Sequence, residues 1–243
     1  MFPIFKKEIN TFFSSLIGYI VVGVFLITTG LFIWVFPDTN ILDQGYATLE
    51  YLFAFAPNVL MFLIPAITMR SFAEEQQTGT IEFLATRPIS GTSIILGKYL
   101  ACLVLVIFAI LPTLLYFYTI HSLGAPVGNI DSGAVWGSYL GLVFLGAVFV
   151  AIGVFASALT TNQIVAFILA VFLCFFVFLG FDFMSNFPGF VGTIDYIIEM
   201  FGINYHYHSI SRGILDSRDI IYFLSVIVAF ILMTQLALER RKW

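Results

Sequence analysis

Long intervals without a charged residue constrain this chain more than any other feature. Five intervals contain no Asp, Glu, Lys or Arg: 9–37, 51–69, 99–130, 132–181 and 220–238. An α-helix needs about 20 apolar residues to cross the hydrocarbon core of a bilayer, so the fourth interval is long enough for two crossings. We therefore predict an all-α integral membrane protein with six spans, at roughly 15–36, 51–69, 99–120, 134–158, 163–183 and 220–238.

The composition agrees with this fold class. Apolar residues make up 60% of the chain and charged residues 10%, and the mean hydropathy is +1.04. A soluble domain carries about 25% charged residues. The spans and their connectors use nearly all of residues 1–243, so we expect one membrane domain and no soluble catalytic domain. No basic patch is present that would bind nucleic acid.

The distribution of charge predicts the orientation, because Lys and Arg near span ends stay in the cytoplasm. If the N-terminus is cytoplasmic, eight of the ten basic residues fall inside and nine of the 14 acids fall outside. We therefore expect a multi-pass membrane protein with both termini in the cytoplasm.

Residues 1–14 have the pattern of an amphipathic helix. Phe2, Phe5, Ile9 and Phe12 recur at spacings of three and four, with polar residues between them. Such a helix is expected to lie on the inner membrane surface before the first span. The alternative is a plain extension of that span.

The connector 70–98 is the longest one on the cytoplasmic side. Thr80 is a good N-cap for a short helix that ends near Arg87, because Pro88 disfavours helical geometry in the residue before it. Ser90 is expected to cap the third span. A short helix of mixed apolar and charged surface suits docking to a soluble partner, although an ordinary solvated connector has the same pattern.

The residues of this connector resemble a known family. The run Glu74-Glu75-x-x-Thr-Gly-Thr80-Ile-Glu-Phe-Leu84, followed by Pro-Ile-Ser90, is similar to the loop between spans two and three of type-2 ABC exporter permeases. The turn beginning at Ser157 and the approach to the sixth span also resemble that family. Within it, the chain looks most like the permease associated with bacterial gliding motility, which is related to the copper-maturation permeases of nitrous oxide reductase operons.

The resemblance implies a fold, partners and functional residues. It implies an N-terminal interfacial helix, six spans, a cytoplasmic coupling helix, and a separate ABC ATPase present in two copies that binds ATP and Mg. It also implies a second permease subunit or a second copy of this chain, and we expect no cofactor in the chain itself. The expected ATPase-coupling residues are Glu74, Glu75, Thr80, Ile81, Glu82, Phe83, Leu84 and Arg87. The expected second cytoplasmic turn holds Thr160, Asn162 and Gln163.

The chain has no recognisable nucleotide site or catalytic group of its own. A phosphate-binding loop requires G-x-x-x-x-G-K-[ST]. The nearest approach, from Gly91 to Tyr99, has one residue too many and ends in Tyr. We found no catalytic constellation and no charged residue in the middle of a predicted span, so a proton relay is not expected.

Several uncharged residues within the spans predict local features. Pro57, Pro65 and Pro112 are expected to kink or unwind their helices, with Asn58 satisfying backbone groups that Pro57 frees. Gly137 and Gly141 form a G-x-x-x-G pattern, which favours close helix packing within the chain. Two cysteines, Cys102 and Cys174, are expected to be buried thiols.

The outer connector 182–219 is the expected contact with an extracytoplasmic partner or with substrate leaving the membrane. A short amphipathic helix is predicted near Ile194–Phe201. Arg212 runs against the positive-inside bias, and Asp216 lies at the spacing of a helical i,i+4 ion pair. The expected outer-face cluster is Arg212, Asp216, Arg218 and Asp219. The pair His206 and His208 is a weak metal signal, and no metal site is predicted.

Three functions remain open from sequence. The first is the permease subunit of an ATP-driven exporter. The second is a mechanical transmitter that works on a periplasmic partner and moves no substrate. The third is a membrane enzyme acting on lipid, which the missing catalytic constellation disfavours.

Overall fold

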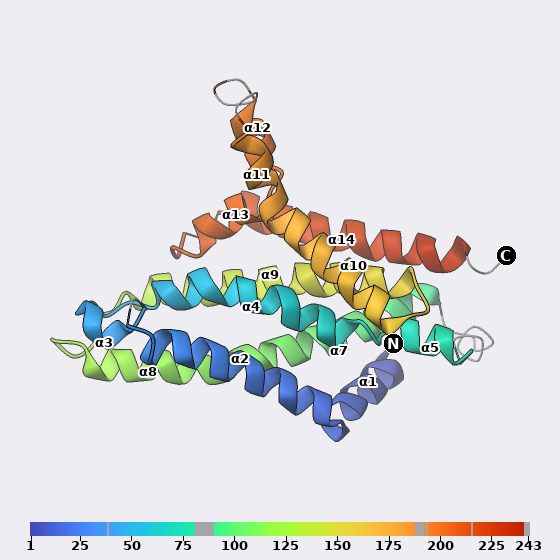
Figure 1. The fold of residues 1–243 in the computed structure, drawn as a ribbon, viewed down its shortest axis with the longest axis horizontal. Helices are drawn as coiled ribbons and strands as arrows, with labels where there is room; N and C mark the ends of the chain where they lie inside the picture. The colour runs from blue at the N-terminus through green and yellow to red at the C-terminus, as the bar shows by residue number, and fades with distance from the viewer. Residues whose placement is uncertain (38, 81–89, 188–191, 193, 215, 241–243) are drawn as a thin grey trace.

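The structure is a computed structural model and describes residues 1–37, 39–80, 90–187, 192, 194–214 and 216–240. Every regular element in these residues is a helix (Figure 1). The main helices of the six apolar segments are α2 (Leu16–Trp34), α4 (Glu50–Thr68), α7 (Gly91–Ile110), α9 (Ser132–Ala158), α10 (Gln163–Phe175) and α14 (Ser217–Arg240). The other helices are α1 (Phe2–Ser14), α3 (Ile41–Gln44), α5 (Ala73–Gln77), α8 (Leu114–Leu123), α11 (Phe181–Ser185), α12 (Asp195–Glu199) and α13 (Ile203–Ile210).

The helices form a bundle long and apolar enough to cross a membrane. Five segments qualify alone: 50–77, 91–123, 132–158, 163–185 and 217–240. A sixth exists if α1 and the helix over 18–34 are counted together, and these two meet at a bend of 67°. The bend separates α1 from α2, so α1 is not a straight extension of the first span. The fold class predicted from sequence is confirmed.

The helix α9 is the centre of the bundle. It packs against α4, α7, α10 and α14. In its most apolar stretch of 18 residues, 78% are buried inside the protein, against 17% in the corresponding stretch of α14. Figure 1 shows α1, α5 and the end of α14 at one end of the bundle, which we call the α5 end. The helix α3 and the start of α9 lie at the opposite end, which we call the α3 end.

The prolines affect their helices less uniformly than expected. The helix α4 continues through Pro57 and Pro65, whereas Pro112 lies in a 3-10 turn, Leu111–Thr113, between α7 and α8. Pro57 has no N–H, so the carbonyl of Phe53 loses its helical donor. The hydroxyl of Tyr207 on α13 donates to that carbonyl at 2.7 Å. Tyr207 therefore performs the role that the sequence assigned to Asn58, and Asn58 donates to the carbonyl of Ala54 instead.

The predicted G-x-x-x-G packing is confirmed. A Cβ atom at Gly137 would lie 2.9 Å from the Cα of Gly213, and one at Gly141 would lie 2.5 Å from a methyl carbon of Ile210. The two glycines therefore let the end of α13 approach the backbone of α9 within the same chain. Both cysteines are buried and free, as expected.

The connector between the fifth and sixth spans contains more helix than the sequence predicted. Within the fifth span, a π-helix, Phe176–Gly180, joins α10 to α11. Beyond that span, α12 continues the sideways projection that α11 begins (Figure 1). The predicted short helix near Ile194–Phe201 exists as α12. The helix α13 was not predicted, and it packs against α9 and α14.

Candidate functional site

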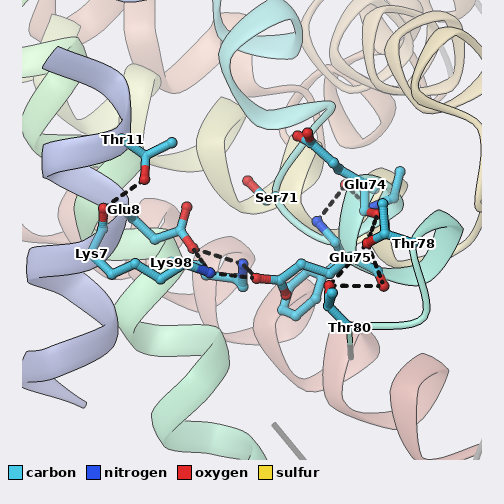
Figure 2. A network of polar contacts seen from close by, with 12 residues as sticks. Lys7, Glu8, Thr11, Ser71, Glu74, Glu75, Thr78, Thr80 and Lys98 are labelled. Carbon is cyan, nitrogen blue, oxygen red and sulfur yellow. Dashed lines mark hydrogen bonds and ion pairs between the residues drawn. The ribbon is translucent and has the colours of Figure 1, made fainter. Parts of the chain in front are cut away.

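An ion-pair network joins three helices at the α5 end (Figure 2). The ammonium of Lys98 on α7 lies 2.9 Å from Oε1 of Glu8 on α1 and 2.9 Å from Oε1 of Glu75 on α5. The ammonium of Lys7 lies 3.1 Å from the same oxygen of Glu75 and 3.8 Å from Glu8. Two cations thus hold two carboxylates from helices that are far apart in the sequence.

Lys98 corrects one expectation from sequence. The sequence placed this residue in the cytoplasmic connector, before a third span at roughly 99–120, but α7 already begins at Gly91, capped by Ser90 as predicted. Lys98 is therefore inside the helix and not in the connector, with a side chain only 2% exposed. A charge at such a place requires partners, because an unpaired buried ion loses its hydration without compensation. Glu8 and Glu75 supply that compensation, and the ring of Phe72 lies 5.2 Å from the ammonium.

The four charged groups differ in burial. The side chains of Glu8 and Glu75 are 13% and 12% exposed, whereas that of Lys7 is 60% exposed. Burial favours the neutral amine of Lys7, but the hydrogen bond and charge of Glu75 outweigh it and raise the pKa of Lys7. Lys7 is thus a cation at the edge of the network, and Lys98 is the cation at its centre.

The described residues among those expected to face an ATPase separate into an exposed group and a buried one. Glu74 and Thr80 are exposed, and the hydroxyl of Thr78 donates to the carbonyl of Glu74. Glu75 points inward and is occupied by Lys7 and Lys98 (Figure 2). The remaining expected residues, Ile81, Glu82, Phe83, Leu84 and Arg87, lie outside the described residues.

A cavity of about 300 Å³ lies beside this network, between α1, α5 and the end of α4. Arg70 and Glu75 both line it. The Nε atom of Arg70 and the Oε2 atom of Glu75 are buried without a hydrogen-bond partner among the described residues. The α5 end therefore contains polar groups whose bonding is incomplete within the described part of this chain.

The second expected turn lies next to α5. Thr160 accepts from the amide of Asn162, whose side chain caps α10 by accepting from the amides of Ile164 and Val165. Gln163 is the first residue of α10. The side chain of Gln76 on α5 donates to the carbonyl of Ala158 at 3.1 Å. The two turns predicted from separate stretches of sequence are therefore neighbours.

The expected outer-face residues lie together around the start of α14, but they do not form the expected ion pair. Arg212, Asp216, Arg218 and Asp219 all line one cavity of about 500 Å³. The helical Arg212–Asp216 ion pair is wrong, because α13 ends at Ile210 and α14 begins at Ser217. Arg212 donates from Nε to the carbonyl of His208.

The two acids of this cluster have separate structural roles. Asp216 accepts from the amide of Arg218 at the start of α14. Asp219 lies 2.7 Å from Nδ1 of His206, whose Nε2 lies 3.0 Å from the carbonyl oxygen of Met200. The buried His206 side chain therefore connects α13 to α14 and to the end of α12. The sequence did not predict these contacts.

Comparison with known families assigns the chain. The model of the family described as ABC-2 family transporter protein matches residues 2–243, so the chain belongs to the ABC-2 transporter family. A search of curated proteins found no match. Membership makes the chain a multi-pass permease subunit of an ABC transporter, a class in which a separate ATPase typically hydrolyses ATP.

Proposed function

We propose that this chain is the permease subunit of an ATP-driven exporter in the bacterial inner membrane, with the α5 end in the cytoplasm. The connector after α5 docks to the ATPase, with Glu82 and Arg87 forming charge-assisted contacts and Ile81, Phe83 and Leu84 the apolar anchor. The observation that carries this proposal is the ion-pair network, because it connects the docking connector to the rest of the bundle.

The network provides a mechanical route from the docking connector. Glu75 is on α5, which comes shortly before the proposed docking residues 81–87 in the sequence. Its carboxylate is held by Lys98 on α7 and Lys7 on α1. A displacement of the connector by the ATPase therefore acts on the third span and on the interfacial helix together. Since Lys98 is almost fully buried, solvent screens its two ion pairs much less than pairs at a surface.

The complex contains two ATPase copies, because ABC ATPases bind ATP and Mg between them and close as a pair. Two permease domains face that pair, as two copies of this chain or as this chain with a related one. The resemblance of the chain to the gliding-motility branch of the family supports a role in gliding motility, with the outer connector 182–219 as the contact for a periplasmic partner.

The proposal also includes the alternative that the ATP cycle performs mechanical work outside the membrane without moving a substrate. The sideways projection of α12 from the bundle favours this alternative (Figure 1). That helix carries exposed apolar residues such as Ile197, which a periplasmic partner could cover. Movement of a substrate into proteoliposomes by the reconstituted complex distinguishes export from purely mechanical work.

The docking part of the proposal is tested by the double substitution Glu82→Lys with Phe83→Ala. The variant is expected to insert into the membrane normally and to lose co-purification with the ATPase. Glu50→Lys is the matched control, since it makes the same charge change at the start of α4, which lies at the α3 end. Recovery of the ATPase with the double variant at the yield of the unmodified chain would show that the connector is not the docking surface.

A further inference from the structure

The corner between α4 and α5 has no cap of its own. The residue at the N-cap of α5, Phe72, makes no capping hydrogen bond with its side chain. The first amides of a helix have no partner within it, so they need an acceptor from elsewhere when they are buried. Phe72 and Ala73 are both buried.

A residue from a different span supplies that acceptor. The hydroxyl oxygen of Ser157, in the last turn of α9, accepts from the amide of Phe72 at 2.9 Å and from that of Ala73 at 3.0 Å. The same hydroxyl donates to the carbonyl of Met69 at 3.0 Å. Ser157 is fully buried, and its single hydroxyl makes three hydrogen bonds across the corner.

The surrounding contacts hold the same two segments together. One turn earlier on α9, a Cβ atom at Gly153 would lie 2.0 Å from the hydroxyl oxygen of Thr68, so the end of α4 lies directly against the α9 backbone. One residue after Ser157, the carbonyl of Ala158 accepts from the side chain of Gln76. The corner is therefore attached to α9 on both sides of the Ser157 hydroxyl.

We propose that Ser157 is a positioning residue that makes the α4–α5 corner and α9 move as one body. This inference rests on the proposed function, in which the ATPase displaces the connector after α5. The ion pairs of Glu75 carry that displacement to α1 and α7, and the hydroxyl of Ser157 carries it to α9. Since α9 packs against α10 and α14, the fifth and sixth spans then follow.

The first test measures the capping itself in the isolated chain. Ser157→Ala leaves the amides of Phe72 and Ala73 buried without an acceptor, so their hydrogen exchange is expected to accelerate by about tenfold or more. Ser157→Cys keeps the volume but accepts hydrogen bonds weakly, so it should accelerate exchange less. Unchanged exchange in both variants would overturn the proposal.

A matched control exists on the same helix. Ser138 is also buried on α9, and its hydroxyl contacts the carbonyls of Ala134 and Ser211 at 2.8 and 2.7 Å, near the α3 end. Ser138→Ala removes a comparable buried hydroxyl without touching the corner. It is expected to leave the exchange of Phe72 and Ala73 unchanged, and equal acceleration there would mean that Ser157 has no particular role.

The second test measures movement in the assembled complex with the ATPase. Spin labels at Gln77 on α5 and Leu140 on α9 occupy exposed positions. In the otherwise unmodified complex, trapping with ATP and vanadate should leave their separation constant, and in Ser157→Ala it should change. A separation that stays constant in Ser157→Ala overturns the inference, whereas failure of the unmodified chain to bind any ATPase overturns the proposed function instead.

Discussion

Replacing Lys98 by Met should destabilise the protein far more than replacing Lys7 by Met. Both ammonium groups lie close to Oε1 of Glu75, at 2.9 and 3.1 Å. Their side chains differ in exposure, at 2% for Lys98 and 60% for Lys7. Distance alone predicts similar effects for the two substitutions, whereas burial predicts very different ones.

The expected magnitudes follow from that difference. Removing one partner of a buried ion pair costs about 3–5 kcal/mol, because the other charges stay buried without compensation. Lys98→Met leaves Glu8 and Glu75 with Lys7 alone, whose exposed ammonium compensates two buried carboxylates only in part. An ion pair with an exposed partner contributes about 0–1 kcal/mol, which is the cost expected for Lys7→Met.

The free energy of unfolding can be measured by titrating the detergent-solubilised chain with a denaturing detergent. Adding Glu8→Gln and Glu75→Gln to Lys98→Met should recover most of the lost stability, because no buried charge then lacks a partner. Equal costs for the two single lysine substitutions, or no recovery in the triple variant, would refute the burial argument.

Three further predictions concern other parts of the molecule. Tyr207→Phe should lower the free energy of unfolding by about 1 kcal/mol, because the Phe53 carbonyl loses its donor; an unchanged unfolding titration would contradict this. Arg212→Ala should permit assembly with the ATPase but lower the activity of the complex, and full activity in a transport or motility assay would assign Arg212 a purely structural role. A cysteine at Val127 should react with an impermeant thiol reagent in intact cells, and one at Gln77 only after the inner face is exposed; labelling at Gln77 in intact cells would invert the orientation.

The spans could be predicted from sequence because a long apolar interval has few alternatives to a membrane helix. The predicted fourth span ends at residue 158 and the fifth begins at 163, as observed. The burial of Lys98 was not predicted, because its charge was taken to mark the cytoplasmic connector. Hydropathy assigns a charged residue to water and cannot show that acids from other helices neutralise it.

The contacts of the candidate site depend on tertiary structure that no local pattern contains. Glu8 and Lys98 are 90 residues apart in the chain, and Ser157 is 85 residues from the amide of Phe72. The Arg212–Asp216 pairing failed for a related reason, because helical spacing was applied to a stretch that is not helical. Short motifs located the regions of interest, while the partners of individual residues required the fold.

Site-specific photo-crosslinking from α5 tests the central claim most directly. A photoreactive residue at Gln77, which is exposed at the end of α5, should crosslink in native membranes to a soluble chain that carries the phosphate-binding loop of an ATPase. The same residue at Val127, exposed at the α3 end, should give no such product. A crosslink to an ATPase from position 127 but not from position 77 would contradict the account, as would the absence of an ATPase product from both positions.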